Sequence, residues 1–433
     1  MLTIQGMRQS FCDGVSRRNF LKIGAAGFAG LTLAELLRAE ALAGSQATGK
    51  SIINIYLSGG PTHMDTFDLK PNAPKEFRGE FSPISTKATG MDICELMPRL
   101  ASVGDKFALV RSVSGVNNEH APTQSDSGWK QKDMQAQGGR PGLGPVMSKL
   151  FGAANETPDG VAPTAVDLTG WTKPGFLGQT HSAYRPDGTG RQNLTLDSRL
   201  GEQRFTDRQE LLTDLDRLRR QIDASGMMDA MDSFSSRAAS LITSGRIAKA
   251  LDLKDESAET LDRYGAKKAG ENQNFVLARR LIEAGVRNVA LSIGGWDTHG
   301  NNFKAMRTKL PALDVALSAL ISDLDDRGRL DDTLILMSGE FGRTPRINSG
   351  AGRDHWPQAS FFFLGGGGLK TGQVIGSTSR LGERPEDRPV HLQQIFATIY
   401  HQLGIDVQSA LLTDPNGRPQ YLVEHRDIIP ELV

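Results

Sequence analysis

The chain has 433 residues, with 50 lysines and arginines against 50 aspartates and glutamates, so its formal net charge is zero. A chain without a basic excess lacks the electrostatic pattern of proteins that bind nucleic acid or an anionic membrane surface, so we expect neither partner. The length allows a single large α/β domain.

The N-terminus has the pattern of a twin-arginine export signal. Arg17 and Arg18 precede an uncharged stretch at 23–34 that is rich in glycine and alanine, and residues 41–43 (Ala-Leu-Ala) supply a small-x-small cleavage site. The apolar stretch is shorter than the roughly 20 residues that span a bilayer. A membrane anchor is therefore the weaker interpretation.

We predict that residues 1–43 are removed during export by the twin-arginine translocase. The mature domain, 44–433, is then expected in the periplasm or outside the cell, without stable membrane insertion. Of the two cysteines, Cys12 leaves with the signal. Cys94 stays alone and cannot form an internal disulfide.

Short apolar runs rich in β-branched residues recur along the chain and are typical of buried parallel strands. In chain order they are 52–57, 107–110, 165–168, 286–293, 333–337 and 360–364. Apolar residues at helical spacing precede two of them, at 274–284 and 310–324. This alternation predicts an α/β fold, a mostly parallel sheet with helices on both faces.

One stretch does not fit the alternation of helix and strand. From 206 to 253 the chain is charged, poor in glycine and helical in pattern. We predict a helical insertion at about 200–270, formed by solvated helices packed on the core. A helix pair that binds a partner is the alternative.

Polar residues follow the predicted strands at the edge where open α/β sheets bind ligands. After 52–57 a glycine-rich turn presents His63, Asp65 and Asp68. A carboxylate here can bind a divalent cation, or it can cap a turn. After 286–293 come Asp297 and His299, which suit a zinc-like ion better than a purely structural role.

Two later loops add candidates. Glu340 follows 333–337, and Arg343 is close behind; the pair can hold a metal and an oxyanion together, or it can form an ion pair that closes the loop. His355 can supply a second imidazole. Asp354 can be a further ligand or can orient one.

Four loops occur here in the same order as in one known family: Gly59-Gly60 with Asp65 and Asp68, Gly-Trp-Asp297-Thr-His299-Gly, Gly-Glu340-Phe-Gly-Arg343-Thr-Pro, and Gly-Arg-Asp354-His355-Trp-Pro. This is the twin-arginine-exported domain of unknown function 1501 family, which resembles the alkaline phosphatase/sulfatase superfamily. The similarity covers nearly the whole mature chain. It implies an alkaline-phosphatase-like sheet carrying a site for two divalent metal ions (zinc, calcium, manganese or magnesium).

The resemblance also implies the ligands. Asp65 serves as the carboxylate of one metal, and Asp297 with His299 holds the other. Glu340 stands where a second-site aspartate is usual, and His355 matches the late histidine ligand. Where the superfamily often has a ligating histidine, this chain has Phe341.

The nucleophile of that superfamily follows the second strand, and the matching stretch here is 117–128. The Cys-x-Pro-x-Arg signature of sulfatases is absent from the sequence. Thr123 or Ser125 can attack, while His120 can be a ligand, an acid/base group or structural. Arg343 can clamp the substrate.

The sequence thus favours a metal-dependent hydrolase of phosphate or sulfate esters, acting on a small molecule or a polysaccharide. The metal would activate a hydroxyl or a water molecule for attack. The alternative is a non-catalytic envelope protein of the same fold that binds a glycan or a protein. A redox role is disfavoured because the chain has neither a thiol pair nor a dinucleotide fingerprint.

Overall fold

The computed structural model describes residues 48–157, 160–187 and 245–433. The predicted signal at 1–43 and the larger part of the predicted insertion lie outside the described residues. Within the part of the chain that the structure describes, no helix has both the length and the apolar character needed to cross a bilayer.

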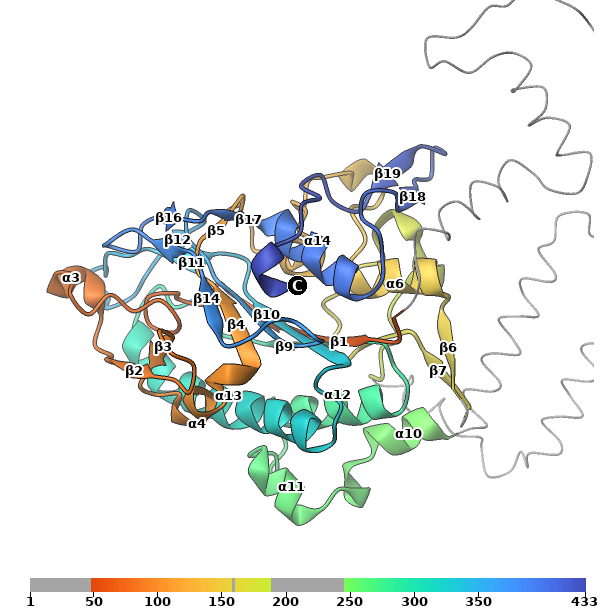
Figure 1. Ribbon diagram of the computed structural model, residues 1–433, viewed down its shortest axis with the longest axis horizontal. Helices are drawn as coiled ribbons and strands as arrows, with labels where there is room; N and C mark the ends of the chain where they lie inside the picture. The colour runs from red at the N-terminus through yellow and green to blue at the C-terminus, as the bar shows by residue number, and fades with distance from the viewer. Residues whose placement is uncertain (1–47, 158–159, 188–244) are drawn as a thin grey trace, which may run out of the picture.

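A seven-stranded sheet forms the centre of the molecule (Figure 1). From one edge to the other its strands are β14 (Gln373–Ile375), β4 (Phe107–Val110), β13 (Phe362–Gly366), β10 (Thr333–Ser338), β1 (Ser51–Leu57), β9 (Asn288–Ile293) and β8 (Ala165–Asp167). All run in one direction except β13, which pairs antiparallel with both β10 and β4. The predicted α/β fold with a mostly parallel sheet is confirmed.

Every apolar run singled out in the sequence is a strand of this sheet. The run at 360–364 corresponds to β13, the one reversed strand, and a run of apolar residues carries no information about direction. The edge strand β14 was not predicted, because it has three residues and two of them are only partly buried.

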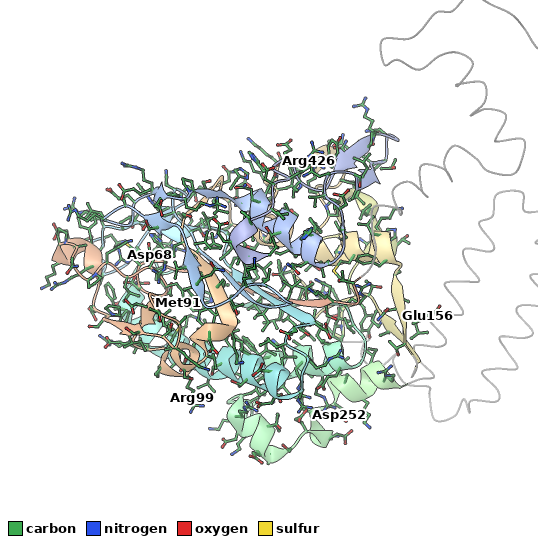
Figure 2. The ribbon with its side chains drawn as sticks, viewed as in Figure 1. Asp68, Met91, Arg99, Glu156, Asp252 and Arg426 are labelled. Carbon is green, nitrogen blue, oxygen red and sulfur yellow. The ribbon has the colours of Figure 1, made fainter. Side chains whose placement is uncertain are left out.

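Alternate residues of the central strands point to opposite faces, as the pleat of a strand requires. Ile53 and Ile55 of β1 lie in one core with Ile335 of β10, while Ile52 and Leu334 lie in the other. Helices α12 and α13 cover the first face, and α6 and α14 cover the second (Figure 1). Side chains fill the space on both sides of the sheet (Figure 2).

The described α-helices are α3 (Lys75–Arg78), α4 (Pro98–Ser102), α5 (Thr123–Ser127), α6 (Leu143–Phe151), α10 (Arg246–Leu251), α11 (Ala258–Arg263), α12 (Gln273–Glu283), α13 (Asn302–Asp326) and α14 (Leu392–Gln402). The predicted helix at 310–324 is therefore only part of α13. Phe303 and Met306 are buried and continue its apolar spacing towards the N-terminus.

Short two-stranded pairs surround the sheet. They are β2 (Pro83–Ser85) with β3 (Asp92–Cys94), β5 (Val113–Ser114) with β17 (Val390–His391), β6 (Ala154–Thr157) with β7 (Gly160–Pro163), β11 (Gly342–Arg343) with β12 (His355–Trp356), β15 (Ser377–Thr378) with β16 (Pro385–Asp387), and β18 (Leu411–Thr413) with β19 (Pro419–Tyr421). Cys94, at the end of β3, is a buried free thiol, as predicted.

The two-sided core predicts a large cost for truncation in a central strand. Leu336 of β10 is fully buried, so Leu336→Ala should lower the free energy of unfolding by about 2–5 kcal/mol. Urea denaturation measures the loss. The same substitution at Leu261, which is only partly buried at the rim of the core, should cost clearly less; equal losses at the two positions would contradict this packing.

Candidate metal centre

Three neighbouring parallel strands end at one edge of the sheet, and the loops that follow them carry candidate residues. Strands β10, β1 and β9 are adjacent. Glu340 follows β10, Gly59 follows β1, and Asp297 and His299 follow β9. The parallel order brings these loops together, because the carboxyl ends of parallel strands share one edge.

Two further segments reach the same edge. In the β11–β12 pair His355 lies opposite Arg343. This pairing brings the imidazole of His355 back to the segment that follows β10. His120 comes from the loop between β5 and α5. His120 and His355 therefore come from parts of the chain that are 235 residues apart.

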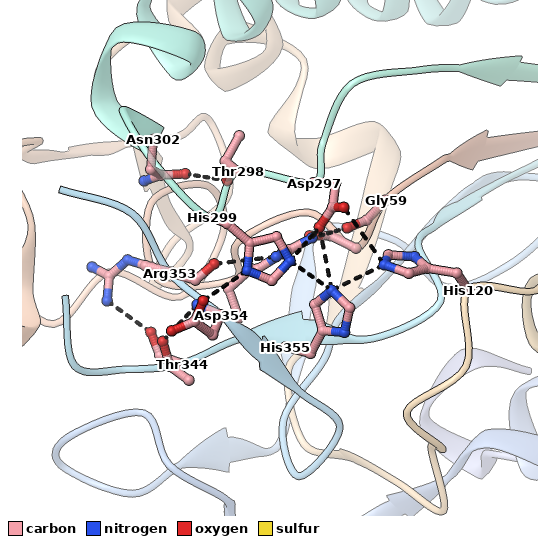
Figure 3. A network of polar contacts seen from close by, with 12 residues as sticks. Gly59, His120, Asp297, Thr298, His299, Asn302, Thr344, Arg353, Asp354 and His355 are labelled. Carbon is pink, nitrogen blue, oxygen red and sulfur yellow. Dashed lines mark hydrogen bonds and ion pairs between the residues drawn. The ribbon is translucent and has the colours of Figure 1, made fainter. Parts of the chain in front are cut away.

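Four side chains meet here: His120, Asp297, His299 and His355 (Figure 3). We refer to them as the histidine–aspartate cluster. Nε2 of His355 lies 2.9 Å from Nε2 of His120, 3.0 Å from Nε2 of His299 and 3.2 Å from Oδ1 of Asp297. Oδ1 of Asp297 also lies 3.0 Å from Nε2 of His299.

The cluster fits a bound divalent cation. Ligating atoms of His120, Asp297 and His355 all lie within 4.8 Å of one another, and imidazole nitrogen with carboxylate oxygen is a common donor set for such ions. A single N–H at Nε2 of His355 could donate a hydrogen bond to only one of its three neighbours, which are Nε2 of His120, Nε2 of His299 and Oδ1 of Asp297. Burial, the largest effect, lowers the pKa of His355 and so favours the neutral form that binds metals.

Arg343 holds Asp297 rather than facing solvent. The guanidinium is fully buried, and it donates to the carbonyl oxygens of Gly59, Gly60 and Arg353 and, at 2.5 Å, to Oδ1 of Asp297. Burial raises the pKa of Asp297, but the hydrogen bond and charge of Arg343 outweigh it, so the pKa lies below its ordinary value. The contacts favour a positioning role for Arg343 over the predicted substrate clamp.

Glu340 contacts the cluster from its buried side. Its buried carboxylate accepts hydrogen bonds from the backbone N–H groups of Gly59 at 3.0 Å and Gly60 at 2.9 Å, and Oε1 lies 3.1 Å from Nδ1 of His120. A Cβ on Gly59 would lie 2.5 Å from the backbone nitrogen of Asp297, so this close approach requires glycine. Glu340 therefore bonds to a cluster histidine, whereas we had predicted it as a metal ligand.

Asp65 lies outside the cluster, although the resemblance implied it as a ligand. Its carboxylate is buried and accepts hydrogen bonds from Nε of Arg353 at 2.7 Å and from Nη2 of Arg353 at 3.1 Å. Asn302 and Thr62 also donate to it, at 2.8 and 2.9 Å. The guanidinium of Arg353 thus neutralises the carboxylate of Asp65, for which the resemblance implied a metal ion as the partner.

Phe341 forms an apolar wall beside the cluster. The side chain is fully buried, and its ring centroid lies 5.2 Å from that of His120 and 4.5 Å from that of His355. The position at which the superfamily often has a ligating histidine therefore contributes packing here.

The two candidate hydroxyl nucleophiles differ in burial. Thr123 is half-buried at the start of α5, while Ser125 is fully buried in the middle of that helix. In the described residues, no serine or threonine hydroxyl forms a hydrogen bond with His120, His299 or His355. Neither hydroxyl is therefore hydrogen-bonded to a histidine of the cluster.

Sequence reasoning missed one partner of the cluster and left another open. Oδ1 of Asn118 lies 3.0 Å from Nδ1 of His355, and nothing in the sequence marks Asn118 except its place two residues before His120. Asp354 had been weighed as a ligand or an orienting group. Its Oδ1 lies 2.7 Å from Nδ1 of His299, which is the orienting arrangement.

Residues 49–433 match the family described as "Protein of unknown function (DUF1501)". The chain belongs to this family. The membership expected from the four loops is confirmed, and the family's description assigns no activity. A comparison with curated proteins found no match.

Two solved structures show weak similarity. The lipoteichoic acid synthase LtaP from Listeria monocytogenes is 12% identical, with a TM-score of 0.33; the match covers 85% of this chain and 78% of that one. Ps i-CgsB, solved in complex with k-i-k-neocarrahexaose, is 11% identical, with a TM-score of 0.32; the match covers 84% of this chain and 73% of that one. Similarity at this level assigns no activity to the chain.

The buried Asp65–Arg353 pair predicts a strong asymmetry between single and double variants. Arg353→Met leaves a carboxylate buried without its cation and should cost about 3–5 kcal/mol of unfolding free energy. The double variant Arg353→Met/Asp65→Asn should recover part of that loss. Urea denaturation with a chelator present measures both, and an unchanged midpoint for Arg353→Met would contradict the pairing.

Asp126 of α5 predicts a pH dependence of stability. Burial, the largest effect, raises the pKa of this carboxyl group to about 7. The native state therefore holds a proton that the unfolded state releases near pH 4. The stability that Asp126 contributes is complete below pH 4 and is lost as the pH rises through about 7.

Asp126→Asn should remove this part of the pH dependence. In urea denaturation with a chelator, the wild type should lose stability between pH 5 and pH 8 by at most about 1.4 kcal/mol per pH unit from this group. The variant should lose less over the same range. Parallel pH profiles for the two proteins would contradict the assignment.

Proposed function

We propose that the chain is a metal-dependent hydrolase of phosphate or sulfate esters that acts outside the cytoplasm. The observation that carries the proposal is the convergence of His120, His299, His355 and Asp297 at the carboxyl edge of the sheet. These residues would hold the metal. A divalent cation bound there would supply a Lewis acid that polarises an ester oxygen and stabilises the charge that develops on it.

The exposure of the cluster supports access by a substrate. The side chains of His120, Asp297 and His299 are 42%, 45% and 47% exposed, so the ligand atoms lie at the surface rather than in the core. A purely structural metal site is usually closed by its ligands. A solvent-exposed site at the edge of the sheet suits an enzyme whose substrate is an ester group carried on a polysaccharide.

The protein's own groups would prepare the site before the substrate arrives. Arg343 keeps Asp297 ionised and fixes its direction through a short hydrogen bond. Phe341 closes the inner side of the cluster against the core. Because no serine or threonine hydroxyl in the described part of the chain bonds to the cluster histidines, we propose water as the attacking group, with Thr123 as the alternative.

The absence of a serine or threonine hydroxyl bonded to the cluster histidines, in the described part of the chain, favours a second candidate. This candidate is a non-catalytic envelope protein that binds a glycan or a protein. Such a protein would keep the metal centre and lack a reacting hydroxyl. Export by the twin-arginine route belongs to both proposals and is supported by Arg17, Arg18 and the cleavage pattern at 41–43.

Ester turnover separates the two candidates. We expect metal-loaded protein to hydrolyse at least one class among phosphate and sulfate mono- and diesters, and His355→Ala to lower kcat/KM by about 100-fold or more, because one of four ligands is lost. His401→Ala, an exposed histidine outside the cluster, is the matched control and should keep full activity. No turnover of any of these esters with any of the four metals would favour the binding protein.

A further inference from the structure

Each imidazole of the cluster is bonded on the nitrogen that faces away from the centre. Nδ1 of His120 lies 3.1 Å from Glu340, Nδ1 of His299 lies 2.7 Å from Asp354, and Nδ1 of His355 lies 3.0 Å from Asn118. In all three cases the partner atom is a side-chain oxygen. Three histidines from three separate segments of the chain therefore share one pattern.

The two carboxylate partners decide where the protons lie. A carboxylate only accepts hydrogen bonds, so the contacts with Glu340 and Asp354 require a proton on Nδ1 of His120 and of His299. In the neutral imidazole the lone pair is then on Nε2, and the Nε2 atoms of both residues lie within 3.0 Å of Nε2 of His355. With Nδ1 of His355 donating to the Asn118 oxygen, a third lone pair joins them, beside the carboxylate of Asp297.

A proton on Nε2 of His355 would not satisfy this arrangement. It could bond to only one of Nε2 of His120, Nε2 of His299 and Oδ1 of Asp297, so two acceptors close to Nε2 of His355 would remain without a donor. A cation among the four atoms interacts favourably with all of them. The tautomers that the outer partners select are the ones that bind a metal.

The donor set also selects the kind of ion. Calcium and magnesium prefer oxygen ligands, and magnesium keeps several waters. Imidazole suits zinc and its neighbours among the transition metals. Asp65, the carboxylate expected for another metal, is already neutralised by Arg353. In the described ranges, the side chains grouped closely enough to hold an ion lie in this cluster: ligating atoms of His120, Asp297 and His355 lie within 4.8 Å of one another, and Nε2 of His299 lies 3.0 Å from Nε2 of His355 and from Oδ1 of Asp297.

We propose that the cluster binds a single zinc-class ion and that Glu340, Asp354 and Asn118 are positioning residues that fix its three imidazoles in the metal-binding tautomer. The proposal rests on the metal centre of the proposed function and is independent of the ester chemistry.

The three positioning residues differ in how firmly they are held. The carboxylate of Glu340 is buried and anchored by the backbone N–H groups of Gly59 and Gly60, whereas Asp354 and Asn118 are exposed. A fixed acceptor orients an imidazole more strictly than a mobile one, because less freedom is lost when the metal binds. Glu340 should therefore have the largest effect on metal affinity.

The test is zinc affinity and stoichiometry, measured on the full mature chain by competition with a chromogenic chelator and by elemental mass spectrometry. We expect one zinc per chain, and Glu340→Ala and Asp354→Ala, which remove the acceptor, should weaken zinc binding by about 10–100-fold. Asn118→Ala should weaken it less. Asn118→Asp restores an acceptor and adds a carboxylate, so it should bind zinc at least as tightly as the wild type.

Asp314→Asn is the control for loss of a buried carboxylate. Asp314 accepts hydrogen bonds from Leu100 and Arg99 at the start of α4, away from the cluster, so this variant can lose stability but should keep the zinc affinity. If Glu340→Ala does not fold, the variants at the exposed residues Asp354 and Asn118 still test the proposal. The visible spectrum of cobalt-substituted protein gives a second readout, and it should change in the positioning variants and remain unchanged in Asp314→Asn.

Two results would overturn the proposal: unchanged zinc affinity in folded Glu340→Ala and Asp354→Ala, or two zinc ions per chain of which one is lost in Asp65→Asn. A wild type that binds no zinc would overturn this proposal, and one that binds none of the four metals would overturn the proposed function as well. Zinc binding that depends on the positioning residues, without turnover of any ester, would uphold this proposal and reject the proposed function.

Discussion

Three imidazole nitrogens and one carboxylate oxygen meet at the carboxyl edge of the sheet, and with the tautomers that we propose their lone pairs repel unless a cation lies among them. Nε2 of His355 has three such neighbours within 3.2 Å. Parallel strands make this possible, because β1, β9 and β10 deliver their loops to one edge. The short β11–β12 pair and the loop before α5 then add His355 and His120. The fold and the cluster are therefore parts of one arrangement.

Two buried guanidinium groups hold the loops in place around that cluster. Arg343 joins the turn after β1 to Asp297 after β9. Arg353 joins Asp65 in the first loop to the carbonyl groups of Thr344 and Pro345. Buried charges are costly unless they are paired and hydrogen-bonded. Arg343 pairs with Asp297 and Arg353 with Asp65, and each also donates to backbone carbonyl oxygens. They give the loops a fixed geometry without using metal, which leaves the histidines free to bind it.

The sequence predicted the strands well because each is a continuous buried apolar run. It predicted Asp297 and His299 because their residue types follow a strand end, and His355 because it lies close to the Glu340 loop in the sequence. It could not show the direction of β13, since a run of apolar residues reads the same either way. It also could not show that Asp65 is neutralised by Arg353, which lies 288 residues further along the chain. Asn118 carried no signal, because an exposed asparagine in a loop is ordinary until a folded imidazole lies beside it.

The most direct measurement is X-ray absorption at the zinc edge of the zinc-loaded mature protein. We expect scattering from several imidazole rings, with zinc–nitrogen distances of about 2.0–2.1 Å, and the loss of one ring's contribution in His355→Ala. A spectrum that shows only oxygen ligands, or one that His355→Ala leaves unchanged, would show that the histidine–aspartate cluster is not the metal centre.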